Sequence, residues 1–482
     1  MREFLRQSQR FFLFFTAAAF ALRLFFILQF PVIHGDSWVY GELAKTWLLH
    51  GTLGFSTGLD AAHASYIRLP GYPAFLAAIW AIFGLEHYRA VLLVQMFVDV
   101  GTCFVVADLA RRTVGPRAAK AAFALAALCP FTANYTACAL AETLAIFFTA
   151  LAFDWAVAAL DDLPSGRLRL WIACGAAVAA GLLVRPDGGM VLAIIGGYLL
   201  WRLLRRPRER QQTFWAGVLL ASVTFAPLVP WTIRNWRDFH RFQPLVNEAA
   251  TDPGETSPGG FALWVKTWML DYASVVDVIF TVEEAPIDIN KLPSRAFDTP
   301  QERERIRQLL DAYNNSEGFN FTPEIDRGFG QIAAERIQRS PLRYYVWLPA
   351  LRVADMWLRP RGEMLNIEDR WWEYQVDPFG FAQAVFLGLL NLFYLGAAAA
   401  GWARKPRGRY WGMLLAFIVV RSLFLTTLAN PEPRYMLECY PVVIVFAARG
   451  LAGLGRRRKR PTETQFESMQ TAPPPAETAV RA

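Results

Sequence analysis

Long apolar stretches alternate with short polar segments along most of this chain. A helix rises 1.5 Å per residue, so roughly 20 apolar residues are needed to cross about 30 Å of hydrocarbon. The pattern predicts about ten membrane-spanning helices. They are expected at residues 11–33, 88–110, 118–135, 142–160, 170–184, 188–204, 214–233, 379–403, 410–429 and 435–454. The expected fold class is therefore an all-α polytopic membrane protein.

Two further apolar segments are too short or too polar to be read as spans. Residues 72–83 form an apolar run that begins in a Pro-Gly-Tyr-Pro corner, and residues 343–358 are amphipathic and contain Arg352 and Asp355. Both are predicted to be interfacial helices that lie on the membrane surface.

The polar segments divide the chain into regions. Residues 1–233 are expected to form an N-terminal transmembrane module whose first outside loop is 34–87. Residues 234–378 are expected to form a small outside, periplasmic cap, and 379–455 the C-terminal transmembrane helices. The basic tail 456–482 is predicted to be cytoplasmic and without fixed structure.

Composition and charge support a membrane protein. Hydrophobic residues make up 54% of the chain and charged residues only 19%, with 49 Lys and Arg against 41 Asp and Glu. The basic residues cluster at 2–10, 111–120, 202–210, 404–409 and 456–460. With both termini cytoplasmic, every cluster falls inside, as the positive-inside rule requires. The basic charge is thus a topology signal of a multi-pass inner (cytoplasmic) membrane protein, and no nucleic-acid partner is expected.

The outer ends of the predicted helices carry the candidate chemistry. Asp36 follows the first span, and Arg68 precedes the rigid corner Pro70-Gly71-Tyr72-Pro73. Ionisable groups at this depth are costly unless they are used or paired. Asp36 could act as a general base, or it could only cap a short helix at 42–49. Arg68 could hold an anion in one pose, or contact a lipid phosphate.

Other outer helix ends add charged groups. Glu142 lies near a helix N-terminus, where a negative charge is also stabilised without any further role. Arg185, Arg234 and Arg434 each stand at a Pro-marked outer helix end. Together with Arg68 they predict an outward pocket for a phosphate or diphosphate.

Charged residues could also form ion pairs inside the bundle or bind a metal ion. Four deeper residues are interpreted as internal pairs within the bundle: Arg23, Asp99, Asp154 and Arg421. No metal site is predicted, although a divalent ion at Asp36, His34 and His63 is an open alternative; the chain has no H-x-x-H or H-E-x-x-H spacing there.

In order and spacing, the motifs resemble those of the bacterial GT-C membrane glycosyltransferases related to protein O-mannosyltransferases and the lipid A aminoarabinose transferase. The motifs that carry the resemblance are Gly35-Asp36-Ser37-x-x-Tyr40, Arg68-x-Pro70-Gly71-Tyr72-Pro73, Ala141-Glu142-Thr143-Leu144, Leu183-Val184-Arg185-Pro186, Pro230-Trp231-Thr232-Ile233-Arg234-Asn235-Trp236 and Pro433-Arg434-Tyr435. One departure is Arg-Leu-Pro-Gly-Tyr-Pro, which stands where the mannosyltransferases show a His-Pro-Pro-Leu-type motif.

The resemblance implies GT-C architecture and transfer of a sugar from a polyprenyl-phosphate donor, with inversion, at the outer face of the membrane. It implies Asp36 as general base with Glu142 as a second catalytic carboxylate. The donor phosphate would be bound by Arg68, Arg185, Arg234 and Arg434, and the acceptor and sugar by Tyr40, His63 and Tyr72. The motif departure leaves the sugar open, and the acceptor could be a lipid, a glycan or a protein.

Two alternatives share the lipid-linked chemistry. A flippase or transporter of lipid-linked saccharides would favour broken helices and charges at the bilayer midplane on paired repeats. Here the polar groups gather at the outer face instead. A polymerase or ligase of surface polysaccharide is the other alternative.

Overall fold

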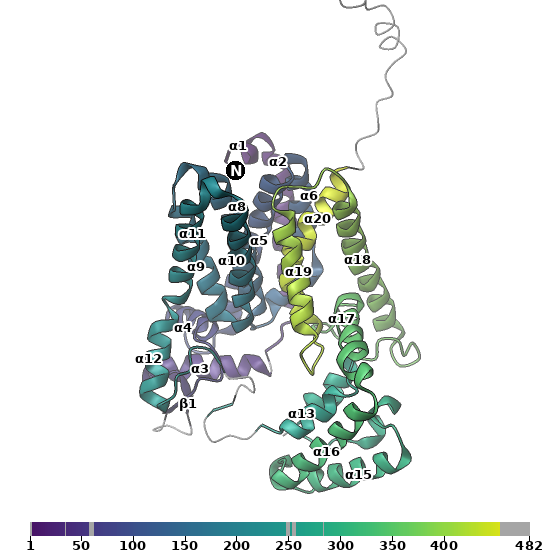
Figure 1. Ribbon diagram of the computed structural model, residues 1–482. Coiled ribbons are helices and arrows are strands. Elements are labelled where there is room, and N and C mark those ends of the chain that lie inside the picture. Colours follow the sequence, from purple (N-terminus) through teal and green to yellow (C-terminus); the bar gives the residue numbers. More distant parts are fainter. Residues whose placement is uncertain are drawn as a thin grey trace, which may run out of the picture.

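A computed structural model describes residues 2–33, 35–56, 62–246, 251–252, 257–282 and 284–453. These residues are mostly helical, as the sequence predicts (Figure 1). They include one small antiparallel sheet, formed by β1 (Gly54–Ser56) and β2 (Ala62–Ala64), in which Phe55 pairs with His63.

An upright helix bundle makes up most of the molecule. Its long elements are α2 (Gln9–Gln29), α5 (Tyr88–Thr113), α6 (Pro116–Ala127), α8 (Glu142–Asp162), α9 (Arg169–Val184), α10 (Gly189–Arg205), α11 (Arg210–Phe225), α18 (Pro378–Ala403), α19 (Trp411–Leu425) and α20 (Tyr440–Ala452). α20 packs against α18 and α6, and α8 packs against α5 and α9. The first and last thirds of the chain therefore share one core.

Seven helical segments of the described chain are long and apolar enough to cross a membrane. The predicted total of ten is not confirmed by this measure. Apolar helices α9 and α19 have only 16 and 15 residues, and the predicted span 118–135 is broken. α6 ends at Ala127 and a separate short helix, α7 (Pro130–Ala133), begins at Pro130. Proline has no N–H to continue the preceding helix, which explains the break.

The segment predicted to be the first outside loop, a name that is kept for it here, folds against the end of the bundle that is drawn at the bottom of Figure 1. It contains α3 (Asp36–His50), the β1–β2 sheet and α4 (Gly71–Phe83). A Cβ atom at Gly71 would lie 2.5 Å from the Leu183 carbonyl carbon and oxygen, so only glycine allows this approach to the end of α9. The close approach of the two segments brings the Arg68 corner next to Arg185.

The loop also contacts α12 (Leu228–Phe239), where the rings of Tyr66 and Phe239 meet edge to face at 4.7 Å. The expected domain boundary at residue 233 therefore falls within a helix.

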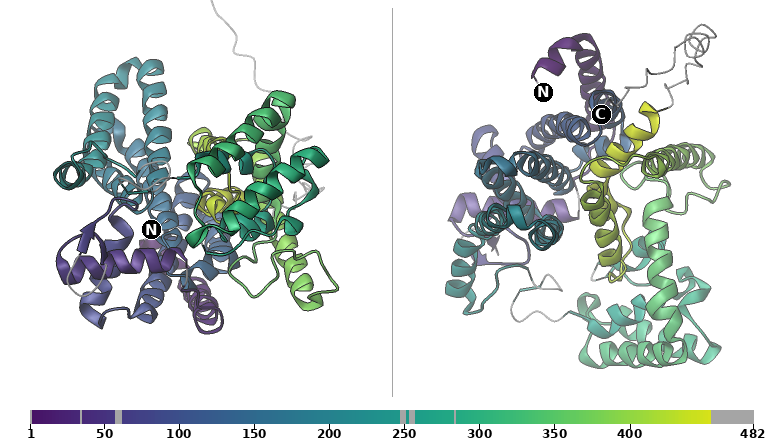
Figure 2. Two further views of the ribbon diagram at one scale, coloured as in Figure 1. Left: turned by 90° about the horizontal axis from the view of Figure 1, so that it is seen from below. Right: turned by 45° about the horizontal axis from the view of Figure 1, so that its top comes forward.

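A second helical unit follows α12. It contains α13 (Gly259–Lys266), α15 (Pro300–Asn314), α16 (Pro323–Arg339) and α17 (Leu348–Leu358). α13, α15 and α16 enclose a hydrophobic core centred on Trp264, Trp268 and Phe329, whereas Met356 of α17 packs with Leu425 and Met436. Thr299 and Thr322 cap α15 and α16 by accepting bonds from Glu302 and Ile325 N–H groups. Figures 1 and 2 show this unit at the same end of the bundle as α3 and α4. We call it the cap.

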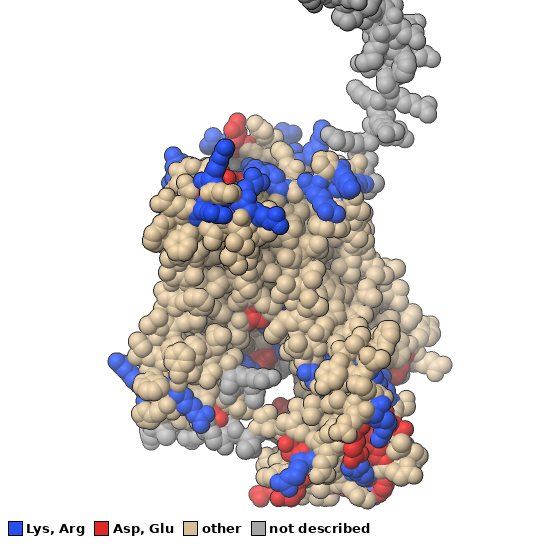
Figure 3. All heavy atoms as spheres, in the orientation of Figure 1, with Lys and Arg blue, Asp and Glu red and all other residues tan. Residues whose placement is uncertain are grey.

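Charge is distributed unevenly between the two ends of the molecule. Figure 3 shows a band of Lys and Arg at the end opposite the cap, and mixed charges on the cap itself. A recess between the cap and the first outside loop contains acidic side chains.

Asp355 on α17 gives the cap a pH-dependent stability. Burial raises the pKa of this carboxyl from 3.8 to about 6, despite the nearby charge of Arg359. The folded state therefore binds the proton more tightly than the unfolded chain. Stability should fall as the pH rises from about 4 to about 6 and stay low above that. We expect Asp355→Asn to stabilise the protein by up to about 2 kcal/mol at pH 8 and not at pH 4.

Thermal unfolding at these two pH values checks this prediction. Asp311→Asn, on an exposed helix of the same cap, is the matched control and should give no such difference. Equal melting shifts for Asp355→Asn at pH 4 and pH 8 would contradict the prediction.

Candidate active site

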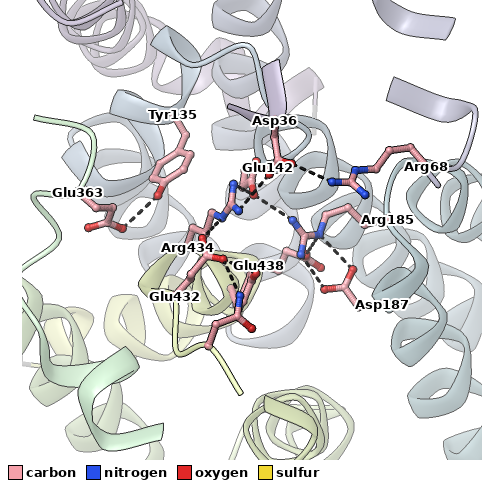
Figure 4. Close-up of polar contacts among 12 residues, drawn as sticks. Asp36, Arg68, Tyr135, Glu142, Arg185, Asp187, Glu363, Glu432, Arg434 and Glu438 are labelled. Carbon is pink, nitrogen blue, oxygen red and sulfur yellow. Dashed lines mark hydrogen bonds and ion pairs between the residues drawn. The ribbon is translucent and has the colours of Figure 1, made fainter. Parts of the chain in front are cut away.

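Charged side chains from distant parts of the sequence meet at the cap end of the bundle (Figure 4). Five carboxylates and four guanidiniums form one network of ion pairs. Its members are Asp36, Glu142, Asp187, Glu432 and Glu438 with Arg68, Arg185, Arg421 and Arg434. All lie at or near the ends of helices that enter or leave the bundle here. We call this group the charge cluster.

Asp36 lies between two arginines from opposite ends of the chain. Its Oδ1 is 2.9 Å from Nη2 of Arg68, and its Oδ2 is 3.1 Å from Nη2 of Arg434. Asp36 is the first residue of α3, and the N-cap residue is Gly35, whose φ of 54° favours glycine. No side-chain capping bond is formed at this helix start. The alternative in which Asp36 serves only as a helix cap therefore does not describe the structure.

The two arginines control the charge of Asp36. Burial disfavours its ionised form, but the charges and hydrogen bonds of Arg434 and Arg68 outweigh burial. The pKa of the Asp36 carboxyl is therefore held below its usual value of 3.8. At neutral pH this side chain is a carboxylate that can accept a proton.

Glu142 and Arg185 form the deeper half of the cluster. Nη1 of Arg185 lies 2.9 Å from Oε1 of Glu142, and its Nε lies 3.2 Å from Oδ1 of Asp187. Arg421 on α19 contacts Asp187 and Glu438 at 2.9 and 2.8 Å. Glu142 and Arg185 are expected from the sequence to take part in catalysis and binding. These contacts link them to Asp187, Glu438 and Arg421.

Exposure separates the members that a substrate can reach from those that support them. The side chains of Asp36 and Arg68 are 31% and 26% exposed. Those of Glu438 and Arg421 are 4% and 0% exposed. The reachable face of the cluster is therefore formed by Asp36 and Arg68, with Arg434 behind them.

Arg434 links the two halves of the cluster. Besides Asp36, it contacts Glu432 through Nε at 2.6 Å and Glu142 through Nη1 at 3.7 Å. The buried Arg361, which follows α17, donates to the carbonyl of Pro433 at 2.8 Å and so fixes the backbone next to Arg434. The segment that connects the cap to α18 therefore helps to position the cluster.

Tyr40 and Tyr72 lie beside the reachable face. Their rings meet edge to face at 4.8 Å, and the Arg68 guanidinium lies 5.9 Å from the centre of the Tyr40 ring. The Tyr72 hydroxyl donates to Gln95 Oε1 at 2.8 Å. Tyr40 thus adjoins the charged face, whereas the Tyr72 hydroxyl is engaged within the bundle.

Arg234 and His63 lie elsewhere on the first outside loop and α12. Arg234 donates to the backbone oxygens of Ser65 and Leu53 and pairs with Asp238 at 2.9 Å. His63 is an exposed residue of β2, next to the ring of Phe55. The structure does not join either residue to the charge cluster, and Arg234 instead ties Leu53 and Ser65, at the outer ends of the two strands, to α12.

We expect Arg234→Gln to loosen the β1–β2 strand pair and to lower transfer by about tenfold or less, because the lost hydrogen bonds hold the strand ends and do not reach the charge cluster. Hydrogen exchange of the β1–β2 backbone would report the loosening. A loss of transfer above a hundredfold with unchanged exchange would instead support the expected phosphate-binding role of Arg234.

Four cluster members were not singled out as site residues from the sequence: Asp187, Arg421, Glu432 and Glu438. Asp187 and Glu432 lie in the Pro-rich motifs that were noticed for their arginines. Arg421, interpreted as an internal pair, is indeed paired, but with the cluster. Glu438 is a single carboxylate inside the predicted span 435–454.

Within the described ranges, no group of three or more His, Cys, Asp and Glu side chains is arranged to hold a metal ion. His34, considered with Asp36 and His63, lies outside those ranges.

A mostly apolar groove opens beside the charge cluster. It has a volume of about 440 Å³ and runs between α10 and α19. Arg185, Asp187 and Tyr435 line its charged end, and Met190, Phe424, Leu425 and Leu428 line much of the rest. The groove thus joins an ionic end to a surface suited to hydrocarbon.

Known proteins resemble this chain in sequence and fold. Residues 63–231 match the family model described as dolichyl-phosphate-mannose-protein mannosyltransferase. No curated protein sequence is significantly similar to the chain. Among solved structures, the Archaeoglobus fulgidus oligosaccharyltransferase with Zn and sulfate is 12% identical, with a TM-score of 0.50. The alignment covers 95% of this chain and 49% of that chain.

Two further structures are similar. AglB from Archaeoglobus fulgidus, in complex with an inhibitory peptide and a dolichol-phosphate, is 13% identical, with 97% and 52% coverage and a TM-score of 0.51. ArnT from Cupriavidus metallidurans is 16% identical, with 93% and 78% coverage and a TM-score of 0.39. This chain spans about half the length of the oligosaccharyltransferases it matches. Residues 63–231 are thus similar to the dolichyl-phosphate-mannose-protein mannosyltransferase family, and the chain shares the helical fold of the archaeal oligosaccharyltransferases.

Proposed function

We propose that this protein is an integral-membrane glycosyltransferase that moves a sugar from a polyprenyl-phosphate donor to an acceptor, with inversion. The reaction would take place at the outer face of the cytoplasmic membrane, beneath the cap. Ten spans with both termini in the cytoplasm remain the proposed topology. The observation that carries the proposal is the position of Asp36 between Arg68 and Arg434 at the reachable face of the cluster.

The apolar groove supports a lipid-linked donor. Withdrawing a polyprenyl chain from the bilayer costs about 0.8 kcal/mol for each CH₂ group. A donor of this kind must therefore react at the boundary of the membrane. The groove between α10 and α19 would let the chain stay in an apolar environment while its phosphate approaches Arg185.

Asp36 would act as the general base. Its carboxylate would take the proton of the acceptor hydroxyl while the acceptor oxygen attacks the anomeric carbon from the face opposite the phosphate. The bond between the anomeric carbon and the phosphate oxygen breaks, so inversion follows. Polyprenyl phosphate leaves with the added negative charge, which the guanidiniums would stabilise in the transition state.

The charge balance of the cluster supports a link between binding of the donor phosphate and the basicity of Asp36. Each of its four guanidiniums is already paired with a carboxylate. An arriving phosphate must therefore share or take over guanidinium contacts. If Arg68 and Arg434 turn toward the phosphate, the pKa of Asp36 rises, since these cations are what holds it low. Donor binding would thus make Asp36 a stronger base.

Glu142 is better placed to orient arginines than to touch substrate. Its side chain is 5% exposed and contacts both Arg185 and Arg434. We therefore propose a positioning role in place of direct catalysis. Tyr40 would border the sugar, and the acceptor would enter through the recess beneath the cap.

Reconstituted full-length protein tests this function. It should convert a labelled polyprenyl-phosphate sugar to free polyprenyl phosphate only when an acceptor extract is present. Sugars of the hexose and pentose classes should be offered in parallel, with the matching nucleotide sugars as the control. Use of a nucleotide sugar, or passage of intact lipid-linked sugar across vesicles without transfer, would contradict the proposal. The second result would support a flippase.

A further inference from the structure

A second large cavity lies at the opposite end of the bundle from the charge cluster. It has a volume of about 650 Å³ and is bordered by the start of α6, the segment after α18 and the end of α20. These helix ends lie within the basic band of Figure 3. Nothing in the proposed transfer reaction uses this cavity.

Four cations line the cavity: Arg117, Arg404, Lys405 and Arg449. Among the residues that the structure describes, up to Gly453 at this end, no carboxylate lines the cavity. Arg404 donates to the carbonyls of Arg449 and Gly450, and Arg449 donates to the carbonyl of Pro406. These acceptors hold the side chains in place but do not cancel their charges.

Four other arginines at this end are paired with carboxylates. Arg111 and Arg112 pair with Asp108, Arg202 pairs with Glu209, and Arg409 pairs with Asp161. In contrast, Nε of Arg449 is buried without a hydrogen-bond partner in the described part of the chain. The cavity therefore concentrates positive charge that the described protein does not compensate.

The start of α6 adds to this potential. Gly115 is the N-cap residue and makes no side-chain capping bond, and Pro116 and Arg117 follow it into the cavity wall. The first N–H groups of a 12-residue helix such as α6 carry partial positive charge and bind anions well. The helix end and the four cations thus favour the same kind of ligand.

We propose that this cavity binds the phosphate headgroup of an anionic phospholipid from the cytoplasmic leaflet. Basic pockets between transmembrane helices on the cytoplasmic side suit such headgroups. The helices that border the cavity continue into the apolar bundle, so acyl chains could lie against them while the phosphate contacts the cations. Free inorganic phosphate offers the same chemistry without the chains, and the experiment separates the two sources.

Native mass spectrometry of the full chain, released from mixed vesicles, would count retained lipids. The vesicles would contain equal amounts of phosphatidylcholine and phosphatidylglycerol. We expect preferential retention of phosphatidylglycerol, and an at least about tenfold loss of this retention in the double variant Arg117→Gln/Lys405→Gln, since each basic residue near an anionic headgroup contributes about fivefold. Both substituted side chains are exposed, so folding should be preserved.

Arg205→Gln/Arg206→Gln is the matched control, because it removes two exposed charges from the same end outside the cavity. Its lipid retention should equal that of the wild type. Equal losses in both double variants, or no loss in the first, would overturn the proposal. The melting temperature in detergent gives a second test. The proposal would also be overturned if inorganic phosphate raised this temperature as much as, or more than, added phosphatidylglycerol did. These measurements of binding do not depend on sugar transfer.

Discussion

Asp36→Asn is expected to lower sugar transfer by about two to four orders of magnitude, the usual contribution of a positioned general base. Asparagine has nearly the same size as aspartate but cannot accept the acceptor's proton. It also removes the negative partner of Arg68 and Arg434. Transfer by the purified variant, measured with a labelled polyprenyl-phosphate sugar, checks this expectation.

Two variants separate the loss of a base from general damage. Glu42→Gln makes the same change from acid to amide on the same helix, where its contact is with Thr46, and should leave transfer intact. Asp36→Glu retains a carboxylate and should keep measurable activity. If Asp36→Asn transfers sugar at the wild-type rate, Asp36 is not the base.

Arg434→Gln is expected to have the second-largest effect. This guanidinium contacts Asp36, Glu142 and Glu432, and its side chain is only 15% exposed. Its removal leaves Glu432, which is 5% exposed, without a cationic partner among the described residues, and it takes one of two arginines away from Asp36 and from Glu142. Breaking a buried pair in this way costs about 3–5 kcal/mol. We expect a much lower melting temperature together with a loss of transfer above a hundredfold.

Arg434→Lys keeps the charge but cannot direct three nitrogens to three carboxylates. It should therefore fold better than Arg434→Gln while transfer stays low. Arg305→Gln is the control, because it breaks an exposed ion pair with Glu335 in the cap. Such a pair contributes about 0–1 kcal/mol. Comparable melting shifts for Arg305→Gln and Arg434→Gln would contradict the central position of Arg434.

Hydropathy and proline placement predicted much of this arrangement. The short apolar helix α4 and the helix start at Glu142 could be read from the printed sequence. The corner at Pro70-Gly71 correctly indicated a fixed approach of Arg68, and the Pro-marked helix ends indicated Arg185 and Arg434. In each of these features, residues that are close together in the sequence restrict the conformation of the backbone.

The remaining features depend on contacts between distant segments. Arg234 has the same local signature as Arg434, a Pro-marked helix end, yet its partners are the backbone oxygens of Leu53 and Ser65, which flank β1 and β2. Arg421 and Glu438 are single charges beside or within apolar runs, and only the packing of α19 against the start of α20 pairs them. The predicted span 118–135 is divided in the structure, where α6 ends at Ala127 and α7 begins at Pro130.

The most direct test of the account is a structure of the full chain with bound polyprenyl phosphate. The account predicts the phosphate within hydrogen-bond distance of two or more of Arg68, Arg185 and Arg434, with the lipid chain in the groove between α10 and α19. It also predicts that Asp36 loses at least one of its two arginine contacts. A phosphate bound away from all three guanidiniums, with the ion pairs of Asp36 unchanged, would contradict it.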